Sequence, residues 1–178
     1  MKKLLSYSLL LILTFSCNAN DFSDTEMYFE TDKETYSPNE KFEIIVNISP
    51  KQGEKKIRIL KNFNNIKISF YTEDGNLGFS EILKDKFIEG RSLFEDESKY
   101  IDEFIISKSE PFNKAFEGSI TESKKKIFFE IPELNIKDSL NKSELINNPT
   151  IIIKGNCSSV YNGIEEVFAQ KEIKILID

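Results

Sequence analysis

Alternation of apolar and polar residues limits the folds open to this chain more than any other feature. In the stretch 41–48, apolar side chains recur at every second position, at Phe42, Ile44, Val46 and Ile48. The stretches 66–70 and 173–177 repeat the pattern. Because successive side chains of a β-strand point to opposite faces, this period predicts strands with one buried face.

Similar runs continue along the chain, and turn-forming residues separate them. Further strands are expected at 27–31, 56–60, 66–71, 101–106, 112–121, 126–131, 150–157 and 165–177. Helical spacing occurs only at 78–90, and a short helical turn is expected within 138–147. We therefore expect an all-β fold, an antiparallel β-sandwich with one or two short helices in its loops.

The segment that precedes the strand at 41–48 has a recognisable order of residues, namely Asp32, Lys33, Tyr36, Pro38 and Glu40. It resembles the first hairpin of immunoglobulin-like domains of the macroglobulin type and of related bacterial envelope modules. This resemblance implies an immunoglobulin-like sandwich and no particular activity. Pro38 fixes φ, and Asn39, where the family usually has Gly, tolerates a left-handed conformation.

The N-terminus has the pattern of an export signal. Lys2 and Lys3 precede an uncharged, leucine-rich stretch, 4–15. As a helix these residues would span about 18 Å, which is short of the roughly 30 Å hydrocarbon core of a bilayer. We therefore expect residues 1–16 to be a signal peptide that is removed.

Residues 13–17, Leu-Thr-Phe-Ser-Cys, end that stretch and resemble the lipobox of bacterial lipoproteins. The resemblance implies that Cys17 is lipidated, that residues 17–25 form a flexible tether, and that the domain is held at a membrane of the cell envelope. The outer membrane or cell surface is favoured over the inner membrane. An ordinary secretory signal cut after Ala19 is the alternative.

The overall charge argues against nucleic acid as a partner. The chain has 24 Lys and Arg against 30 Asp and Glu, a net charge of -6, and its basic run 124–126 lies between Glu122 and Glu130. The absence of His excludes any mechanism in which this chain supplies an imidazole base or ligand. No glycine-rich nucleotide motif and no C-x-x-C occurs, so we expect no cofactor and no metal.

Cys157 is the other cysteine of the chain. It shares its parity with Ile151 and Ile153, so a strand would place it on the apolar face. We expect a buried, inert thiol, because a catalytic cysteine needs a base to lower its pKa.

Acidic residues are concentrated in two segments of the sequence, residues 95–103 and the pair Glu165 and Glu166. Such acids could bind calcium or perform general acid–base chemistry if they were buried together, and otherwise they form a solvated loop. Ser139 and Lys142 satisfy S-x-x-K, but the companion motifs of penicillin-recognising enzymes are absent, so we interpret the match as chance.

Aromatic residues are interleaved with these acids, at Phe79, Phe87, Phe94, Tyr100 and Phe104. Exposed, they would form a surface for a protein or glycan partner, and buried, a small core beneath a long loop. We expect residues 26–178 to form a single domain of a membrane-anchored, non-catalytic binding module. A small exported carboxylate-dependent hydrolase and a structural subunit of an envelope complex are the alternatives.

Overall fold

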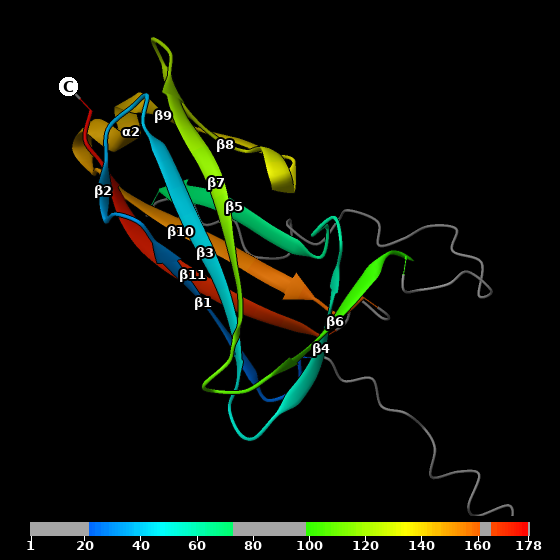
Figure 1. Ribbon diagram of the computed structural model, residues 1–178. Coiled ribbons are helices and arrows are strands. Elements are labelled where there is room, and N and C mark those ends of the chain that lie inside the picture. Colours follow the sequence, from blue (N-terminus) through cyan, green and yellow to red (C-terminus); the bar gives the residue numbers. More distant parts are fainter. Residues whose placement is uncertain (1–21, 73–98, 161–164, 178) are drawn as a thin grey trace, which may run out of the picture.

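β-Strands make up nearly all of the regular structure in the computed structural model, which describes residues 22–72, 99–160 and 165–177 (Figure 1). The strands are β1 (Thr25–Thr31), β2 (Thr35–Tyr36), β3 (Lys41–Pro50), β4 (Lys55–Leu60), β5 (Ile66–Thr72), β6 (Ile101–Ile106), β7 (Phe112–Glu122), β8 (Lys126–Ile131), β9 (Ile136–Asn141), β10 (Thr150–Ser158) and β11 (Glu166–Ile175). The antiparallel, sandwich-like all-β fold that the alternation predicts is confirmed.

Two larger sheets and one ribbon contain these strands. One sheet has the order β1-β3-β7-β8-β9, the second has the order β2-β11-β10-β5, and β4 pairs with β6 in the ribbon. Every ladder is antiparallel except that of β2 with β11. In Figure 1, β3 and β7 run side by side across the direction of β10 and β11, and the ribbon lies at one end of the sandwich.

The core lies between the two large sheets and consists of the inward half of each alternating strand. On β3, the side chains of Ile44, Val46 and Ile48 are fully buried. Aromatic rings join the layers, since Phe70 of β5 stacks on Phe129 of β8 with ring centroids 4.4 Å apart. A β-strand buries one face only when a second layer covers it, so these contacts explain the sandwich.

Elements that lie side by side close the two lateral edges of the sandwich. β1 packs beside β11 at one edge, and β5 packs beside β9 at the other. The second edge has a specific bond, in which the backbone N–H of Phe70 donates to Asp138 Oδ2 at 3.0 Å. The sheets therefore curl toward each other into a half-barrel.

The structure departs from the expected elements in two places. The short helical turn expected within 138–147 is present as α2 (Lys142–Asn147), but the first part of that range belongs to β9. β9 was not expected as a strand, and its pairing with β8 along its whole length defines it. The short strand β2 was not predicted, and the helix expected at 78–90 lies outside the described residues.

The packed chain also begins earlier than the boundary expected at residue 26. Phe22 is buried in the core, and Thr25 Oγ1 donates to its carbonyl oxygen at 2.7 Å. The tether expected at 17–25 therefore gives way to packed structure from Phe22 onward. Within the described ranges, no helix is both long and apolar enough to cross a membrane.

Candidate functional site

The predicted aromatic surface is only partly within the described residues. Cys17, Phe79, Phe87 and Phe94 lie outside them. Tyr100 is 43% exposed just before β6. Phe104 is partly buried and packs edge-on against Phe112, with centroids 5.1 Å apart. Of the two described members, Tyr100 presents a ring to solvent and Phe104 supports the core.

The acids at the end of the 95–103 segment belong to a strand and are paired with cations. Asp102 lies on β6, 3.6 Å from Lys61. Glu103 contacts Lys56 and Arg58 on β4, each at 2.9 Å, and these hydrogen bonds lower the pKa of the Glu103 carboxyl. Glu103 therefore links the two strands of the ribbon, and Asp102 links β6 to the residue that follows β4. Among the described residues, no group of His, Cys, Asp or Glu could hold a metal ion.

The S-x-x-K pair is divided between two elements. Ser139 lies on β9, and its hydroxyl accepts from Lys126 Nζ at 3.3 Å. Lys142 begins α2, and its Nζ lies 2.8 Å from a carboxylate oxygen of Glu122. Ser139 and Lys142 thus have different partners, which agrees with interpreting the motif as chance.

In the second acidic segment, Glu165 and Glu166, the side chain of Glu166 takes part in a hydrogen-bond network that joins two strands. Glu166 Oε1 accepts from Ser158 Oγ at 3.0 Å and from Asn156 Nδ2 at 3.3 Å, joining β11 to β10. Next to it, Cys157 is fully buried, as its parity predicted, and that prediction is confirmed. Asn65 Nδ2 donates to the carbonyl oxygen of Ser158 at 3.1 Å and lies 3.5 Å from Cys157 Sγ.

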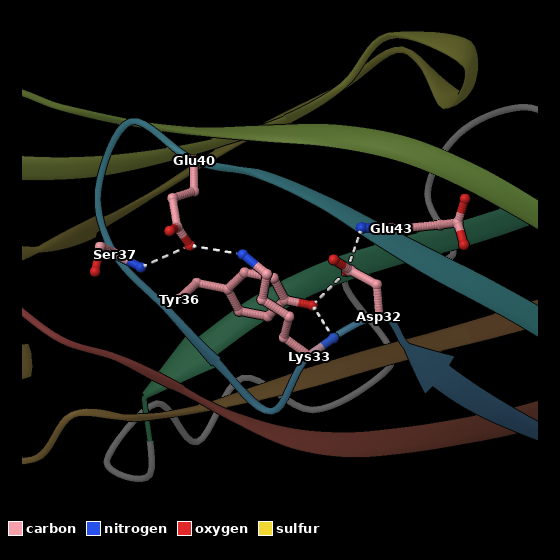
Figure 2. Close-up of polar contacts among 6 residues, drawn as sticks. All are labelled: Asp32, Lys33, Tyr36, Ser37, Glu40 and Glu43. Carbon is pink, nitrogen blue, oxygen red and sulfur yellow. Dashed lines mark hydrogen bonds and ion pairs between the residues drawn. The ribbon is translucent and has the colours of Figure 1, made fainter.

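The hairpin that carried the family resemblance is organised around one carboxylate and one phenol (Figure 2). Tyr36 is 1% exposed, and its hydroxyl donates to Asp32 Oδ1 at 2.7 Å. The same oxygen accepts the N–H of Glu43 at 2.8 Å, and the Tyr36 hydroxyl accepts the N–H of Lys33 at 3.1 Å. Together these bonds fix β3 against the turn that precedes it.

Electrostatics in the hairpin follow from this geometry. Burial alone would raise the pKa of Asp32, but hydrogen bonds from Tyr36 and from the Glu43 N–H outweigh it, so the pKa falls below its ordinary value. Burial and the bond to Asp32 raise the pKa of Tyr36 to about 12. Glu40 completes the turn by accepting the Ser37 N–H at 3.2 Å and pairing with Lys33 at 3.4 Å (Figure 2). We assign this network a structural role.

The outer side of the five-stranded sheet has a different character. Its outward positions on β1, β3 and β7 form what we call the acidic face, which consists of Glu26, Tyr28, Glu30, Glu43, Ile45, Asn47, Asn113, Ala115 and Glu117. The register places Tyr28, Asn47 and Asn113 in one row and Glu30, Ile45 and Ala115 in the next. Glu43 lies directly opposite Glu117 in a third row.

A shallow hollow adjoins the third row of the acidic face. It has a volume of about 460 Å³ and is lined by Glu43, Ala115, Glu117, Pro132 and Glu133. Glu133 is held by Lys114 Nζ at 2.7 Å, and that Nζ lies 4.9 Å from the ring centroid of Phe63. The hollow thus brings together carboxylates from β3, β7 and the 3-10 turn at Pro132–Leu134. Such an arrangement can attract cationic groups.

Sequence reasoning did not single out the acidic face. Alternation alone marks Glu26, Glu30, Glu43 and Glu117 as outward on their own strands, and that signal was available. Their gathering depends on the register and order of three strands, which alternation does not give. No family model, curated protein or solved structure matches this chain.

Proposed function

We propose that this protein is a membrane-anchored lipoprotein of the bacterial cell envelope and that its β-sandwich is a non-catalytic binding module. The observation that carries the proposal is the order of residues 1–17, where two lysines, an apolar stretch of signal-peptide length and Ser16 precede Cys17. Acylation of Cys17 with two or more chains would give durable anchoring, because each buried methylene contributes about 0.8 kcal/mol.

The packed domain begins a short way along the chain from Cys17. Phe22 is already part of the core, so five residue steps separate it from Cys17. An extended chain spans at most about 3.6 Å per residue, which limits the separation to roughly 18 Å. A lipid on Cys17 would therefore hold the β1 end of the sandwich close to the bilayer surface.

Hydrogen bonds around the start of β1 indicate which end of the domain would face the membrane. The N–H of Lys51 donates to the Asp24 carbonyl at 2.7 Å, and Lys55 Nζ donates to Ser23 Oγ at 2.7 Å. The turn between β3 and β4 thus lies beside the start of β1. In the proposed anchored state this end lies nearest the lipid head groups, and the opposite end projects away from them.

The anchor is tested by metabolic labelling with a radioactive or alkyne-tagged fatty acid. We expect label in the unmodified protein and in the Cys157→Ala control, and none in Cys17→Ala, because only Cys17 would carry the thioether. Equal labelling of the Cys17→Ala variant would contradict the proposal. Intact-mass analysis showing an unacylated chain that begins at Asn20 would favour the secretory alternative instead.

The face of the membrane is a separate question with its own measurement. We propose the outer membrane or cell surface, so protease added to intact cells should degrade a surface-exposed domain and spare a periplasmic one. Fractionation of the membranes before the protease treatment distinguishes the outer from the inner membrane. Recovery of the protein in the inner membrane would contradict this localisation while leaving the lipid anchor intact.

A further inference from the structure

We propose that the acidic face docks a basic, extended segment of a partner protein, with Lys or Arg side chains placed among its carboxylates. The inference concerns the outer surface of β1, β3 and β7 and does not depend on whether Cys17 is acylated. It also differs from the aromatic surface predicted at 79–104, because it involves another part of the molecule. Four features of the face support it.

The charge of the face has one sign. Every charged residue at its outward positions is a glutamate, and no Lys or Arg occupies an outward position within 26–30, 43–47 or 113–117. Lys41 lies one row beyond Glu43, at the border. Lys114 belongs to the inward set of β7 and is bound to Glu133. A cationic partner would supply the charge that the face itself lacks.

Glu43 and Glu117 form an unfavourable pair within the sheet. They are direct cross-strand partners on β3 and β7. Like charges directly opposite each other destabilise an antiparallel ladder. The ladder between β3 and β7, which runs from the Lys41–Ser119 pair to the Ile48–Phe112 pair, maintains the register that opposes the two glutamates. A cation bound between them would relieve the repulsion, and binding would then be favoured over the free state.

Asn47 has a buried donor without an acceptor in the described structure. Its side chain is 2% exposed, its Oδ1 accepts from Asn113 Nδ2 at 2.7 Å, and its own Nδ2 has no hydrogen-bond partner. An unsatisfied buried donor is costly. Its cross-strand neighbours Tyr28 and Asn113 are both exposed, so a partner bound on this row would bring a backbone carbonyl next to Asn47.

The centre of the face provides apolar contact as well as charge. Tyr28, Ile45 and Ala115 occupy two adjacent rows between the outer glutamates. A lysine or arginine can place its methylene stem on such side chains and its cationic head over the tyrosine ring. Carboxylates around an apolar centre with amide groups therefore favour a basic peptide segment over a simple inorganic cation.

The test uses the purified full-length protein in detergent and a short fluorescent peptide of alternating lysine and threonine. We compare Glu30→Gln/Glu43→Gln/Glu117→Gln with a matched control, Glu34→Gln/Glu54→Gln/Glu172→Gln, which removes the same charge from other exposed positions. We expect about a tenfold or greater loss of affinity in the first variant and about a twofold or smaller change in the control. Binding should also weaken as salt increases.

Several outcomes would overturn the inference. Equal loss of affinity in both triple variants would show a general effect of net charge, and no saturable binding at low salt would show that the face does not bind basic peptides. If spermine bound the same face as tightly per charge as the peptide, the partner would be a polyamine and not a protein segment. Thermal unfolding of both variants provides the folding control, and Glu117→Gln should raise the melting temperature slightly.

Discussion

At the scale of single residues, close backbone approach explains the glycine in the middle of β7. A Cβ atom added at Gly118 would overlap Cζ of Phe42, its cross-strand partner. The Phe42 ring cannot turn away freely, because it packs edge-on against Tyr36 and Phe70, with centroids at 6.2 and 5.8 Å. The ring therefore occupies the space that a side chain at position 118 would need.

We expect Gly118→Ala to lower the free energy of unfolding by about 1–3 kcal/mol, since the added methyl group overpacks the core. Chemical denaturation monitored by far-UV circular dichroism measures the change. Ser119→Ala, at the next position of the same strand and partly exposed, serves as the control and should stay within about 0.5 kcal/mol of the parent. Equal effects of the two substitutions would contradict this account of position 118.

Burial also determines the chemistry of Cys157. The thiol is fully buried at the end of β10, close to the amide of Asn65. Because reactivity requires an accessible thiolate, we expect a thiol reagent to modify Cys157 in the native protein only as fast as the protein unfolds or opens locally. In denaturant the modification should be rapid. Kinetics with Cys17→Ala, which leaves Cys157 as the only cysteine, would measure this directly. Rapid modification under native conditions would show that the end of β10 opens readily.

At the scale of elements, the hairpin of β1, β2 and β3 depends on the ionised form of Asp32. Its pKa is lowered in the folded protein, so the carboxylate contributes stability above the ordinary pKa of an aspartate. That contribution is lost as the pH falls through the folded pKa. The positive φ of Asn39, 68°, shapes the turn into β3, as the sequence predicted.

We expect the free energy of unfolding to fall less steeply between about pH 5 and pH 3 in Asp32→Asn than in the parent, because the titrating group has been removed. Tyr36→Phe removes only the hydroxyl donor at 2.7 Å, so its slope should be intermediate. Urea denaturation over this pH range measures all three slopes. Identical slopes in the parent and in Asp32→Asn would contradict the proposed role of the carboxylate.

At the scale of the whole molecule, a side-chain hydrogen bond joins the two sheets at the edge where β5 lies beside β9, and no backbone ladder connects these two strands. Asp138 of β9 accepts the N–H of Phe70 on β5 through Oδ2 and the N–H of Ser139 through Oδ1. Since Phe70 also stacks on Phe129, the bond and the aromatic contact hold the same part of the sandwich closed.

Asp138→Ala should destabilise the protein by about 1–3 kcal/mol, because it leaves the partly buried N–H of Phe70 without an acceptor. Hydrogen exchange measured by NMR should show faster exchange at Phe70, with smaller changes in the ladder between β10 and β11. Asp138→Asn retains an acceptor oxygen and should restore much of the protection. Unchanged exchange at Phe70 in Asp138→Ala would mean that other contacts keep this edge closed.

Much of the strand pattern could be predicted from the sequence, because burial of one face imposes a period of two on each strand separately. The alternation at 41–48 marks the inward side chains of β3, and the parity of Cys157 marks its burial. β9 and the two-residue β2 escaped prediction. Pairing with a neighbouring strand defines both of them, and their own residues carry little signal.

The sequence by itself determined the class of fold, the inward face of most strands and the residues on which the anchor proposal depends. Only the tertiary structure decided that Glu43 opposes Glu117, that Asp138 bonds to β5, and that Glu103 pairs with cations of β4 while Asp102 pairs with Lys61 just after that strand. The physical reason is that side-chain parity is a local property of one strand. Register, strand order and contact between sheets are relations between segments far apart in the chain, and the free energy of the whole core selects them.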